Sequence, residues 1–344
     1  MNQQRYAMTR SMVNIHLDRV AAEYNHRLIQ YCAAISPTTE EKAIRRNLVS
    51  RMTDLIQEIW PKAKVELFGS YAKGIYTPTG DIDFTVIGAL PSMDPGGDLA
   101  KKLGDNQDCN NIQFVRNAKV PVVKMTDRRT GIACDFTFNQ KCGMKAVKFI
   151  REFLQEYPVL KYLILILKGC LKGWSIGEVY LGGINSYCLI YLIINFLQIP
   201  GVYDVQSQQP VNIFILLMKF FHYYGMVYDF ENNKIKINNN GAPLLKPRGT
   251  TNYISMEDPC KPGNDIGKSM FGAMQVKHAF QYAYMALLND FLEHRNGPVS
   301  PQFPFYGYLE YLLHFEQTIR KRDRAMTENL PQFTFGYQKC RPLM

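Results

Sequence analysis

The sequence lacks several features that would define a small stapled protein or a membrane protein. Its eight cysteines include no Cys-x-x-Cys pair, so we expect buried free thiols in a reducing compartment instead of a disulfide framework or a zinc site. The longest apolar run, residues 188–196, is interrupted by Asn195 and falls short of the ~20 residues that a membrane-spanning helix requires. The first residues have no apolar core of a signal peptide, and we find no internal repeat or low-complexity tract. We therefore expect no membrane contact, and the residues alone do not separate the nucleus from the cytoplasm.

The composition indicates a folded protein of two domains with a modest positive charge. The chain has 344 residues, 47% of them hydrophobic, and this length corresponds to two domains at roughly 100–200 residues each. Lys and Arg total 40 against 30 Asp and Glu, and the net charge of +10 biases the surface toward polyanions such as nucleic acid. Charge alone does not distinguish a nucleic-acid enzyme from an enzyme with metabolic substrates.

Hydrophobic periodicity divides the chain into a β-rich block flanked by helical segments. Thr38 and Glu41 match a capping box ahead of an amphipathic pattern that Pro61 ends, which predicts a helix. Short β-type runs follow at residues 65–68, 81–87, 121–125 and 132–138. Helical patterns return at 147–154, 160–171, 186–197, 213–224, 272–292 and 304–324, and a polar hairpin or loop is predicted at 228–255. We expect an α+β catalytic domain beside a helical domain to which both chain ends contribute.

Three acidic residues occupy strand positions in the β-rich block. Asp81 and Asp83 stand two apart at the start of an apolar strand, so their carboxylates point to one face. Asp135 is the one charge in the alternating run 132–138. Neighbouring carboxylates repel each other unless cations neutralise them, and their oxygens select hard cations such as Mg²⁺. Since three carboxylates on adjacent strands can hold two metals roughly 3.5–4 Å apart, we expect two Mg²⁺ or Mn²⁺ ions here.

A glycine-serine turn precedes the acids. Gly69 and Ser70 end an apolar run, where a glycine lets the backbone approach a ligand closely and free amides can cradle a phosphate. An isolated Asp-x-Asp is commonly a solvated turn. The combination of Gly-Ser, ten intervening residues, Asp-x-Asp and a later strand Asp resembles the signature of the DNA polymerase β-like nucleotidyltransferases.

Further motifs resemble the noncanonical poly(A) polymerases of the topoisomerase-related branch. They are Ser-Pro-Thr-Thr-Glu-Glu at 36–41, Tyr-Pro-Val-Leu at 157–160, Gly-Gly-Ile-Asn-Ser-Tyr at 182–187 and Glu-Asp-Pro-Cys-Lys-Pro-Gly-Asn-Asp-Ile-Gly-Lys-Ser at 257–269. The last segment resembles the nucleotide recognition motif of that family. The resemblance extends from about residue 35 to about residue 292.

The resemblance implies a fold and a domain order. A polymerase β-like nucleotidyltransferase domain, a mixed sheet with helices on one side, is expected at 41–145. A mostly helical poly(A) polymerase-associated central domain is expected at 146–325. An N-terminal helical segment at 1–40 would pack on the central domain, and 326–344 would form a C-terminal tail.

The resemblance also implies roles for the residues around the acids. Asp81 and Asp83 would ligate both metal ions, and Asp135 would complete the ion that lowers the pKa of the RNA 3′-hydroxyl. Gly69 and Ser70 would hold the β- and γ-phosphates of the nucleotide. Gly143 would contact the nucleotide through its backbone, a role that its sequence context alone does not suggest.

Two lysines and the start of the next helix extend this predicted pocket. Lys168 and Lys172 lie four apart, so they share one face of an apolar helix and would pair with a triphosphate or else reach solvent at the helix edge. By resemblance Lys168 is the phosphate-binding lysine. Ser186 and Tyr187 begin the following helix, where the serine would face phosphate oxygens and the tyrosine would stack on a purine or simply pack.

Asn264 and Lys268 belong to the recognition motif. Asn264 can donate and accept along a base edge, and adenine presents a matching pair, although a turn asparagine would look the same. Lys268 stands where the family usually has arginine, which puts a planar contact to the base or ribose in doubt at this position.

These residues predict a template-independent RNA 3′-adenylyltransferase that adds AMP from ATP to RNA 3′ ends in RNA surveillance, processing or turnover. The alternatives are a uridylyl- or mixed-nucleotide transferase and a catalytically silent RNA-binding scaffold. The chain shows no RNA-binding motif of its own, so an RNA-binding partner such as a zinc-knuckle protein is expected. Nucleus or nucleolus is the expected compartment, with cytoplasm as the alternative.

Overall fold

The computed structural model describes most of the chain between residues 19 and 313. Within that span the description leaves out residues 89, 119, 175, 177–181, 208–209, 238–239, 252 and 297–306. The first 18 residues of the expected N-terminal segment, residues 314–325 of the expected central domain and the expected tail lie outside the described residues. The described chain divides into two compact units, residues 37–141 and residues 19–36 with 142–313.

The unit of residues 37–141 is built on a mixed five-stranded sheet in the order β1-β2-β5-β4-β3. The strands are β1 (Lys64–Phe68), β2 (Ile82–Ile87), β3 (Cys109–Val115), β4 (Val122–Asp127) and β5 (Ala133–Phe138). Strands β2 and β5 pair in parallel and every other pair is antiparallel. Four of these strands were predicted. Strand β3 was missed because its exposed asparagines break the apolar alternation.

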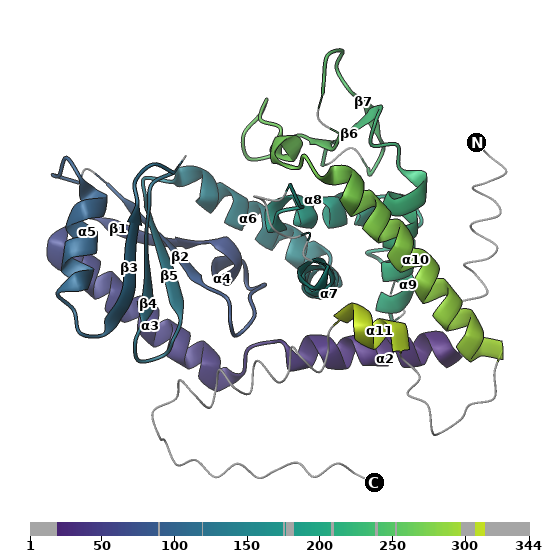
Figure 1. Cartoon of the computed structure of the whole chain (residues 1–344), viewed down its shortest axis with the longest axis horizontal. Helices are drawn as coiled ribbons and strands as arrows, with labels where there is room; N and C mark the ends of the chain where they lie inside the picture. The colour runs from purple at the N-terminus through teal and green to yellow at the C-terminus, as the bar shows by residue number, and fades with distance from the viewer. Residues whose placement is uncertain are drawn as a thin grey trace, which may run out of the picture. The chain divides into compact units, whose positions relative to one another are not determined.

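One face of this sheet carries the core of the unit. Ile82, Phe84 and Val86 of β2 are fully buried, and the Phe84 ring stacks on Phe136 of β5 at 4.8 Å between centroids. Helices α3 (Thr39–Ile59) and α5 (Pro95–Gly104) cover this face (Figure 1). Because strand side chains alternate, the residues between these apolar positions point to the other face, and Asp83 and Asp135 are among them.

Helix α3 begins and ends where the sequence predicts. The Glu41 amide donates to the Thr38 hydroxyl at 3.2 Å and the Thr38 amide donates to the Glu41 carboxylate at 2.6 Å, so the capping box is formed. The helix stops at Ile59, two residues before Pro61. Its buried face includes Arg45, a charged residue that the sequence analysis did not single out.

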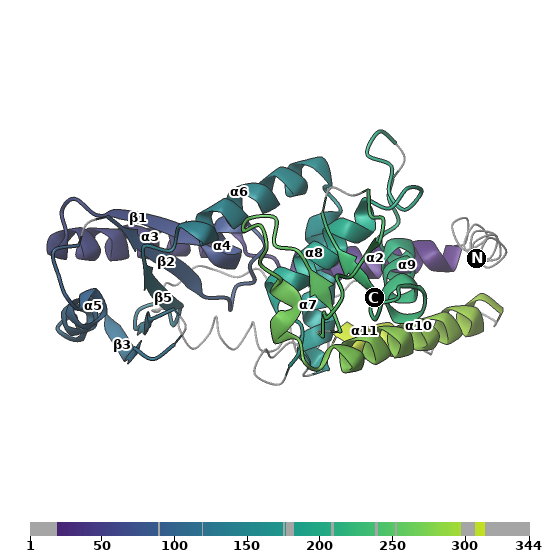
Figure 2. The ribbon, with the colours of Figure 1, turned by 90° about the horizontal axis from the view of Figure 1, so that it is seen from above.

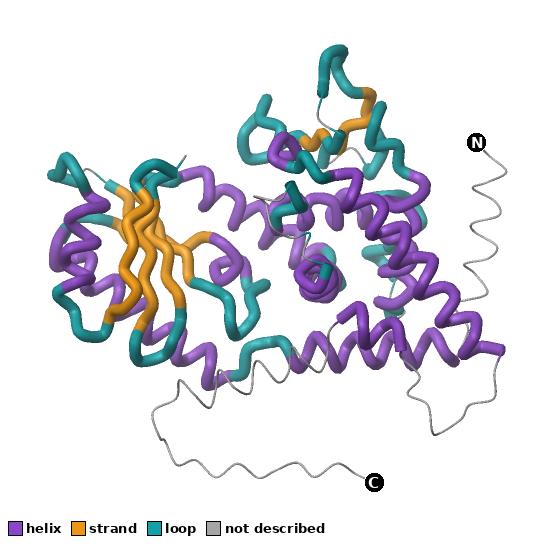
Figure 3. Tube along the Cα trace, viewed as in Figure 1, coloured by secondary structure: helices purple, strands orange, loops and turns teal. Residues whose placement is uncertain are grey.

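The other unit is mostly helical (Figure 3). Its helices are α2 (Arg19–Ala34), α6 (Lys141–Glu156), α7 (Leu160–Gly173), α8 (Ser186–Leu197), α9 (Ile213–His222), α10 (Ala273–Asn296) and α11 (Gly307–Leu313). Helix α8 is apolar all round and is buried from Cys188 to Leu197, as expected for a central helix. Helix α9 continues as the short π-helix η2 (Tyr223–Val227), and α10 packs against both (Figure 2).

A small sheet completes this unit and introduces the segment 257–269. Strands β6 (Asn233–Ile235) and β7 (Leu244–Leu245) form the hairpin predicted within 228–255, and β8 (Ser255–Met256) pairs with β6 in parallel. The ammonium of Lys246 donates to the carbonyls of Phe230 and Tyr253, and so connects the segments before β6 and before β8. Among the described residues, no helix is both long enough and apolar enough to cross a membrane.

Candidate active site

Three carboxylates meet on the face of the sheet opposite the core. Asp83 lies in β2 and is the register partner of Asp135 in the parallel strand β5, while Asp81 directly precedes β2. One carboxylate oxygen from each acid lies within 4.8 Å of one from each of the others. Asp81 is exposed and the other two are half-buried, so the group opens to solvent on one side. This spacing can hold a hard cation.

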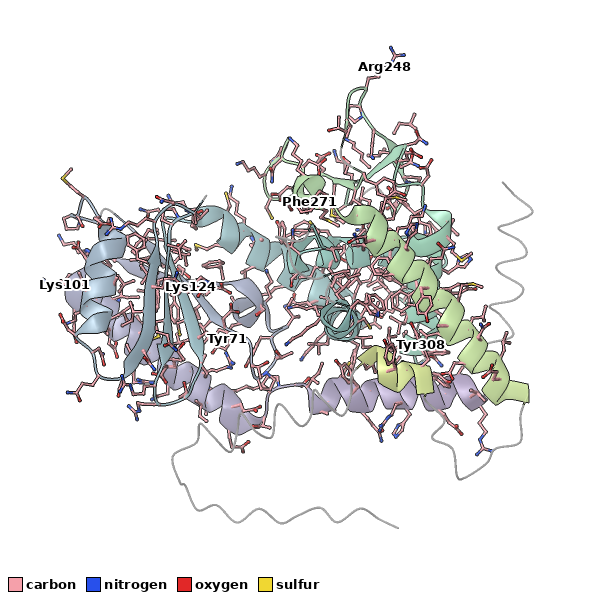
Figure 4. The ribbon with its side chains drawn as sticks, viewed as in Figure 1. Tyr71, Lys101, Lys124, Arg248, Phe271 and Tyr308 are labelled. Carbon is pink, nitrogen blue, oxygen red and sulfur yellow. The ribbon has the colours of Figure 1, made fainter. Side chains whose placement is uncertain are left out.

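Among the described residues, the two lysines whose charges act on Asp83 do not balance the three carboxylates. Burial, the charge of Asp81 and the charge of Asp135, in that order, raise the pKa of Asp83 to about 7. Lys124 of β4, labelled in Figure 4, opposes them, since its ammonium lies 2.6 Å from a carboxylate oxygen of Asp135. The charge of Lys73 also favours ionised Asp83. A divalent cation would supply the missing positive charge, so the residues fit a metal site.

Gly69 lies against the acids and cannot be replaced without a clash. It begins the short helix α4 (Gly69–Lys73) with a φ of +66°, a conformation that glycine adopts readily. A Cβ built on Gly69 would fall 1.7 Å from a carboxylate oxygen of Asp83. The Gly-Ser pair is therefore placed directly beside the central acid, and Ser70 follows as a half-buried residue.

The remaining predicted residues lie in the helical unit, whereas the three acids lie in the unit of residues 37–141. Lys168 is half-buried and Lys172 is exposed on α7. Gly143 lies in the first turn of α6. Ser186 is exposed at the start of α8, whose N-terminus is capped by the Asn185 side chain accepting from the amide of Cys188 at 2.8 Å.

The structure brings two of these residues, Tyr187 and Asn264, to one carboxylate. The Tyr187 hydroxyl donates to Asp258 at 3.1 Å, and the Asn264 side-chain nitrogen donates to the other oxygen of Asp258 at 3.0 Å. The Cys260 amide also donates to Asp258, at 2.9 Å. We call Asp258, Tyr187, Asn264 and Cys260 the recognition cluster. Lys268 is exposed on the short helix η3 (Ile266–Ser269) of the same segment.

A hydroxyl relay extends the recognition cluster into α8. Tyr191, one helical turn after Tyr187, donates its hydroxyl to the Tyr187 hydroxyl at 3.0 Å, and the two rings meet edge to face at 4.6 Å. Burial raises the pKa of the Tyr187 hydroxyl far above its usual range, so it stays a neutral donor. Asp265 holds the segment to β8 by accepting from the Met256 and Gly267 amides.

Sequence reasoning missed Lys124, Arg45 and the central role of Asp258. Lys124 carried a usable signal, because it alternates with the apolar residues of β4 and so shares a face with Asp135. Arg45 also carried one, since it is spaced by three and seven residues from the buried Leu48 and Met52. Asp258 belongs to the quoted motif together with its partners Cys260 and Asn264, but its third partner, Tyr187, lies 71 residues away and no spacing rule connects the two.

Comparisons with known proteins agree with this fold. Residues 25–155 match the family described as poly(A) RNA polymerase, mitochondrial-like, central palm domain, and residues 212–264 match the Cid1 family of poly A polymerases. The solved polymerase core of TRAMP, an RNA surveillance complex, superimposes with a TM-score of 0.73 at 26% identity, covering 88% of this chain and 96% of that one. The Cid1 poly(U) polymerase shares the fold, with a TM-score of 0.70 at 19% identity over 85% of this chain and 98% of that one.

Relatives matched by sequence are also named as poly(A) RNA polymerases. The poly(A) RNA polymerase cid14 of Schizosaccharomyces pombe is 30% identical over 76% of this chain and 40% of the relative. The poly(A) RNA polymerase protein 2 of Saccharomyces cerevisiae is 30% identical over 75% and 46%. The inactive noncanonical poly(A) RNA polymerase protein Trf4-2 of Drosophila melanogaster is 33% identical over 75% and 66%. This chain therefore spans less than half the length of the two fungal relatives.

The mixed sheet, its acid cluster and the helical unit define a polymerase β-like nucleotidyltransferase fold. Within that class, the chain belongs to the noncanonical poly(A) RNA polymerase family. The predicted fold class and family are thus confirmed.

Proposed function

We propose that the protein is a template-independent RNA 3′-adenylyltransferase. It would join the 3′-hydroxyl of an RNA to the α-phosphate of ATP and release pyrophosphate. The observation that carries this proposal is the cluster of Asp81, Asp83 and Asp135 beside Gly69, in a chain of the poly(A) polymerase family. In this proposal residues 41–145 form the catalytic domain and 146–325 the central domain.

The three acids would hold two Mg²⁺ or Mn²⁺ ions. Asp81 and Asp83 would contact both ions and Asp135 one of them. Bound there, the ions would activate the RNA hydroxyl and stabilise the leaving pyrophosphate. The Asp83 carboxyl must be deprotonated to act as a ligand, and its raised pKa of about 7 makes that step dependent on pH.

The recognition cluster favours adenine. Because a carboxylate only accepts hydrogen bonds, Asp258 fixes the Asn264 amide with its nitrogen inward and its oxygen available as an acceptor. Adenine offers an exocyclic amino donor to such an acceptor, whereas the equivalent atom of uracil is a carbonyl oxygen. Tyr187 would stack on the base, with its hydroxyl tied to Asp258.

Other residues would bind the triphosphate and ribose. In this proposal Gly69 and Ser70 hold the β- and γ-phosphates, Lys168 and Lys172 neutralise them, and Ser186 donates to an oxygen. Gly143 would contact the nucleotide through its backbone. Lys268 stands where the family usually has arginine, so it would contact the nucleotide through a compact ammonium group instead of a planar guanidinium.

We further propose that the enzyme acts on RNA 3′ ends with a protein partner. The solved TRAMP polymerase core, which belongs to a surveillance complex, supports a role in RNA surveillance, processing or turnover with an RNA-binding partner such as a zinc-knuckle protein. The nucleus or nucleolus is the proposed compartment, and the cytoplasm is the alternative.

A uridylyl- or mixed-nucleotide transferase is the second candidate, favoured by the fold shared with the Cid1 poly(U) polymerase. A silent scaffold is the third, since one relative is named inactive. The presence of all three acids in one cluster argues against the scaffold.

Incubation of the pure protein with labelled RNA and each NTP separately, with Mg²⁺ or with EDTA, tests the proposal. We expect extension with ATP that requires metal. No extension with ATP, even with a zinc-knuckle partner added, would rule out the adenylyltransferase, and a strong preference for UTP would establish the second candidate.

A further inference from the structure

Arg45 is a buried cation of helix α3. Its side chain is 1% exposed, and it makes no ion pair among the residues that the structure describes. Nitrogen Nη2 donates to the carbonyl of Pro78 at 2.6 Å and to the carbonyl of Gly80 at 2.7 Å. The guanidinium also lies 5.1 Å from the centroid of the Tyr76 ring. Nitrogen Nη1 is buried and has no hydrogen-bond partner in the described part of the chain.

A buried guanidinium with these partners does not stabilise the fold. The free energy lost when a guanidinium leaves water exceeds the free energy gained from hydrogen bonds to two carbonyls and contact with one aromatic ring. The unpaired Nη1 adds to that cost. Burial accordingly lowers the pKa of Arg45. Replacing buried charges by apolar side chains of similar volume is often neutral or stabilising. Arg45 therefore has a role other than stability, and the backbone that its hydrogen bonds hold in place indicates which.

Those hydrogen bonds hold the backbone directly ahead of Asp81. The Gly80 carbonyl belongs to the peptide bond that joins Gly80 to Asp81. The Pro78 carbonyl lies within the preceding turn, which is closed by the Gly80 amide donating to the Thr77 carbonyl at 2.9 Å. Arg45 thus connects α3 to both ends of the segment that delivers Asp81.

Asp81 is the acid that the sheet does not hold. Asp83 is fixed by ladder pairing with Phe68 on one side and Asp135 on the other. Asp81 is exposed and directly precedes β2, so the loop positions it from one side and the first strand residue, Ile82, from the other. Its distance to the other two carboxylates therefore depends on the loop that Arg45 anchors.

We propose that Arg45 is a positioning residue of the metal site, which fixes Asp81 against Asp83 and Asp135 by holding the Pro78 and Gly80 carbonyls. The inference rests on the proposed metal-binding function of the three acids. Residues that orient metal ligands typically change metal affinity about 10- to 100-fold when they are replaced. Arg45 acts through the backbone and does not itself contact the reacting atoms.

Arg51 of the same helix provides a matched control. Its Nη2 pairs with Asp127 at 2.8 Å, and Asp127 is fully buried. Asp127 ends β4 and receives a second hydrogen bond from Thr130 at 2.6 Å. Removing Arg51 leaves a buried carboxylate without its cation, which destabilises a fold strongly. None of the residues bonded to Arg51 is a metal ligand in the proposed site.

Mn²⁺ binding measured by electron paramagnetic resonance, together with thermal unfolding without metal, tests the proposal on the full chain. Arg45→Met is expected to weaken Mn²⁺ binding about tenfold and to leave the melting temperature unchanged or higher. Arg51→Met is expected to lower the melting temperature and to leave Mn²⁺ affinity within about twofold of wild type. Arg45→Lys, which keeps a donor, is expected to recover part of the affinity. In tailing assays, the Mg²⁺ concentration for half-maximal rate should rise for Arg45→Met, while the rate at saturating Mg²⁺ recovers.

Wild-type Mn²⁺ affinity in both Arg45 variants would overturn the proposal. So would a loss of Mn²⁺ binding by Arg45→Met that Arg51→Met reproduces together with the same fall in melting temperature, because both would then act through stability alone. If wild type and Asp83→Asn bind Mn²⁺ equally, the metal site itself is wrong and the proposed function fails with it, a result distinct from failure of the Arg45 role.

Discussion

The two polar clusters of this protein differ in how their carboxylates are satisfied. On the sheet, Asp81, Asp83 and Asp135 face one another, the ammonium of Lys124 pairs with Asp135, and the pKa of Asp83 is raised to about 7. In the recognition cluster, Asp258 accepts hydrogen bonds from Tyr187, Asn264 and Cys260. The three sheet acids carry more negative charge than Lys73 and Lys124 offset, whereas Asp258 has three hydrogen-bond donors in place.

This difference indicates two kinds of site. A cluster that is unfavourable without a cation is suited to binding one, and it costs folding stability until the cation arrives. A cluster whose hydrogen bonds are complete is already organised and can read a base without rearrangement.

Of the variants considered, Asp83→Asn is expected to have the largest effect. Loss of the central ligand is expected to reduce the tailing rate by at least about 10³-fold, because the metal site is lost. The same change removes a repelled charge and should raise the melting temperature of the metal-free protein at pH 8. Tailing assays and thermal unfolding measure the two effects. Asp127→Asn in the same sheet is the control, since it breaks the buried pair with Arg51 and should lower stability instead.

Asn264→Ala tests the recognition cluster. The variant removes the acceptor that Asp258 orients, so the preference for ATP over UTP, as a ratio of kcat/KM values, should fall about twentyfold. Mg²⁺ dependence should stay that of wild type, because Asn264 is no ligand of the sheet acids. An unchanged preference would remove Asn264 from base recognition, and a parallel loss of Mg²⁺ affinity would contradict the independence of the two clusters.

Metal binding is expected to depend on pH through Asp83. Its folded pKa of about 7 lies above the ordinary value of 3.8, so without metal its contribution to stability is present below about pH 4 and is lost as pH rises toward 7. Since the metal binds the ionised form, Mn²⁺ affinity should rise about tenfold between pH 6 and pH 8. Titrations at several pH values measure this. Asp83→Asn should remove the dependence, and a flat wild-type profile would show that Asp83 does not titrate in this range.

The smallest effect is expected from the hydroxyl relay. Tyr191→Phe keeps the ring and removes the donor to Tyr187, so the KM for ATP should rise about threefold with kcat unchanged. Tyr224→Phe is matched, because its buried hydroxyl bonds the Leu192 carbonyl and Asn195 within the core. Steady-state kinetics of both variants decide the question. Equal KM changes in the two would mean that Tyr191 matters only for stability.

The sequence reveals the sheet acids more fully than the elements that support them. Asp81, Asp83 and Asp135 were predictable because period-two spacing places strand side chains on one face, and Thr38 with Glu41 was predictable because a capping box is local. Strand β3 was not, since its exposed asparagines hide the alternation. The contact of Arg45 with Pro78 and that of Asp258 with Tyr187 join residues 33 and 71 positions apart, which only the folded chain brings together.

We propose that the sheet acids and the recognition cluster together transfer AMP. Incubation of the protein with RNA, Mg²⁺ and all four NTPs at equal concentration, followed by sequencing of the extended 3′ ends, measures which nucleotide is added. We expect tails composed of adenosine in wild type and no tails in Asp83→Asn. Tails composed of uridine, or adenosine tails made equally well by Asp83→Asn, would contradict it.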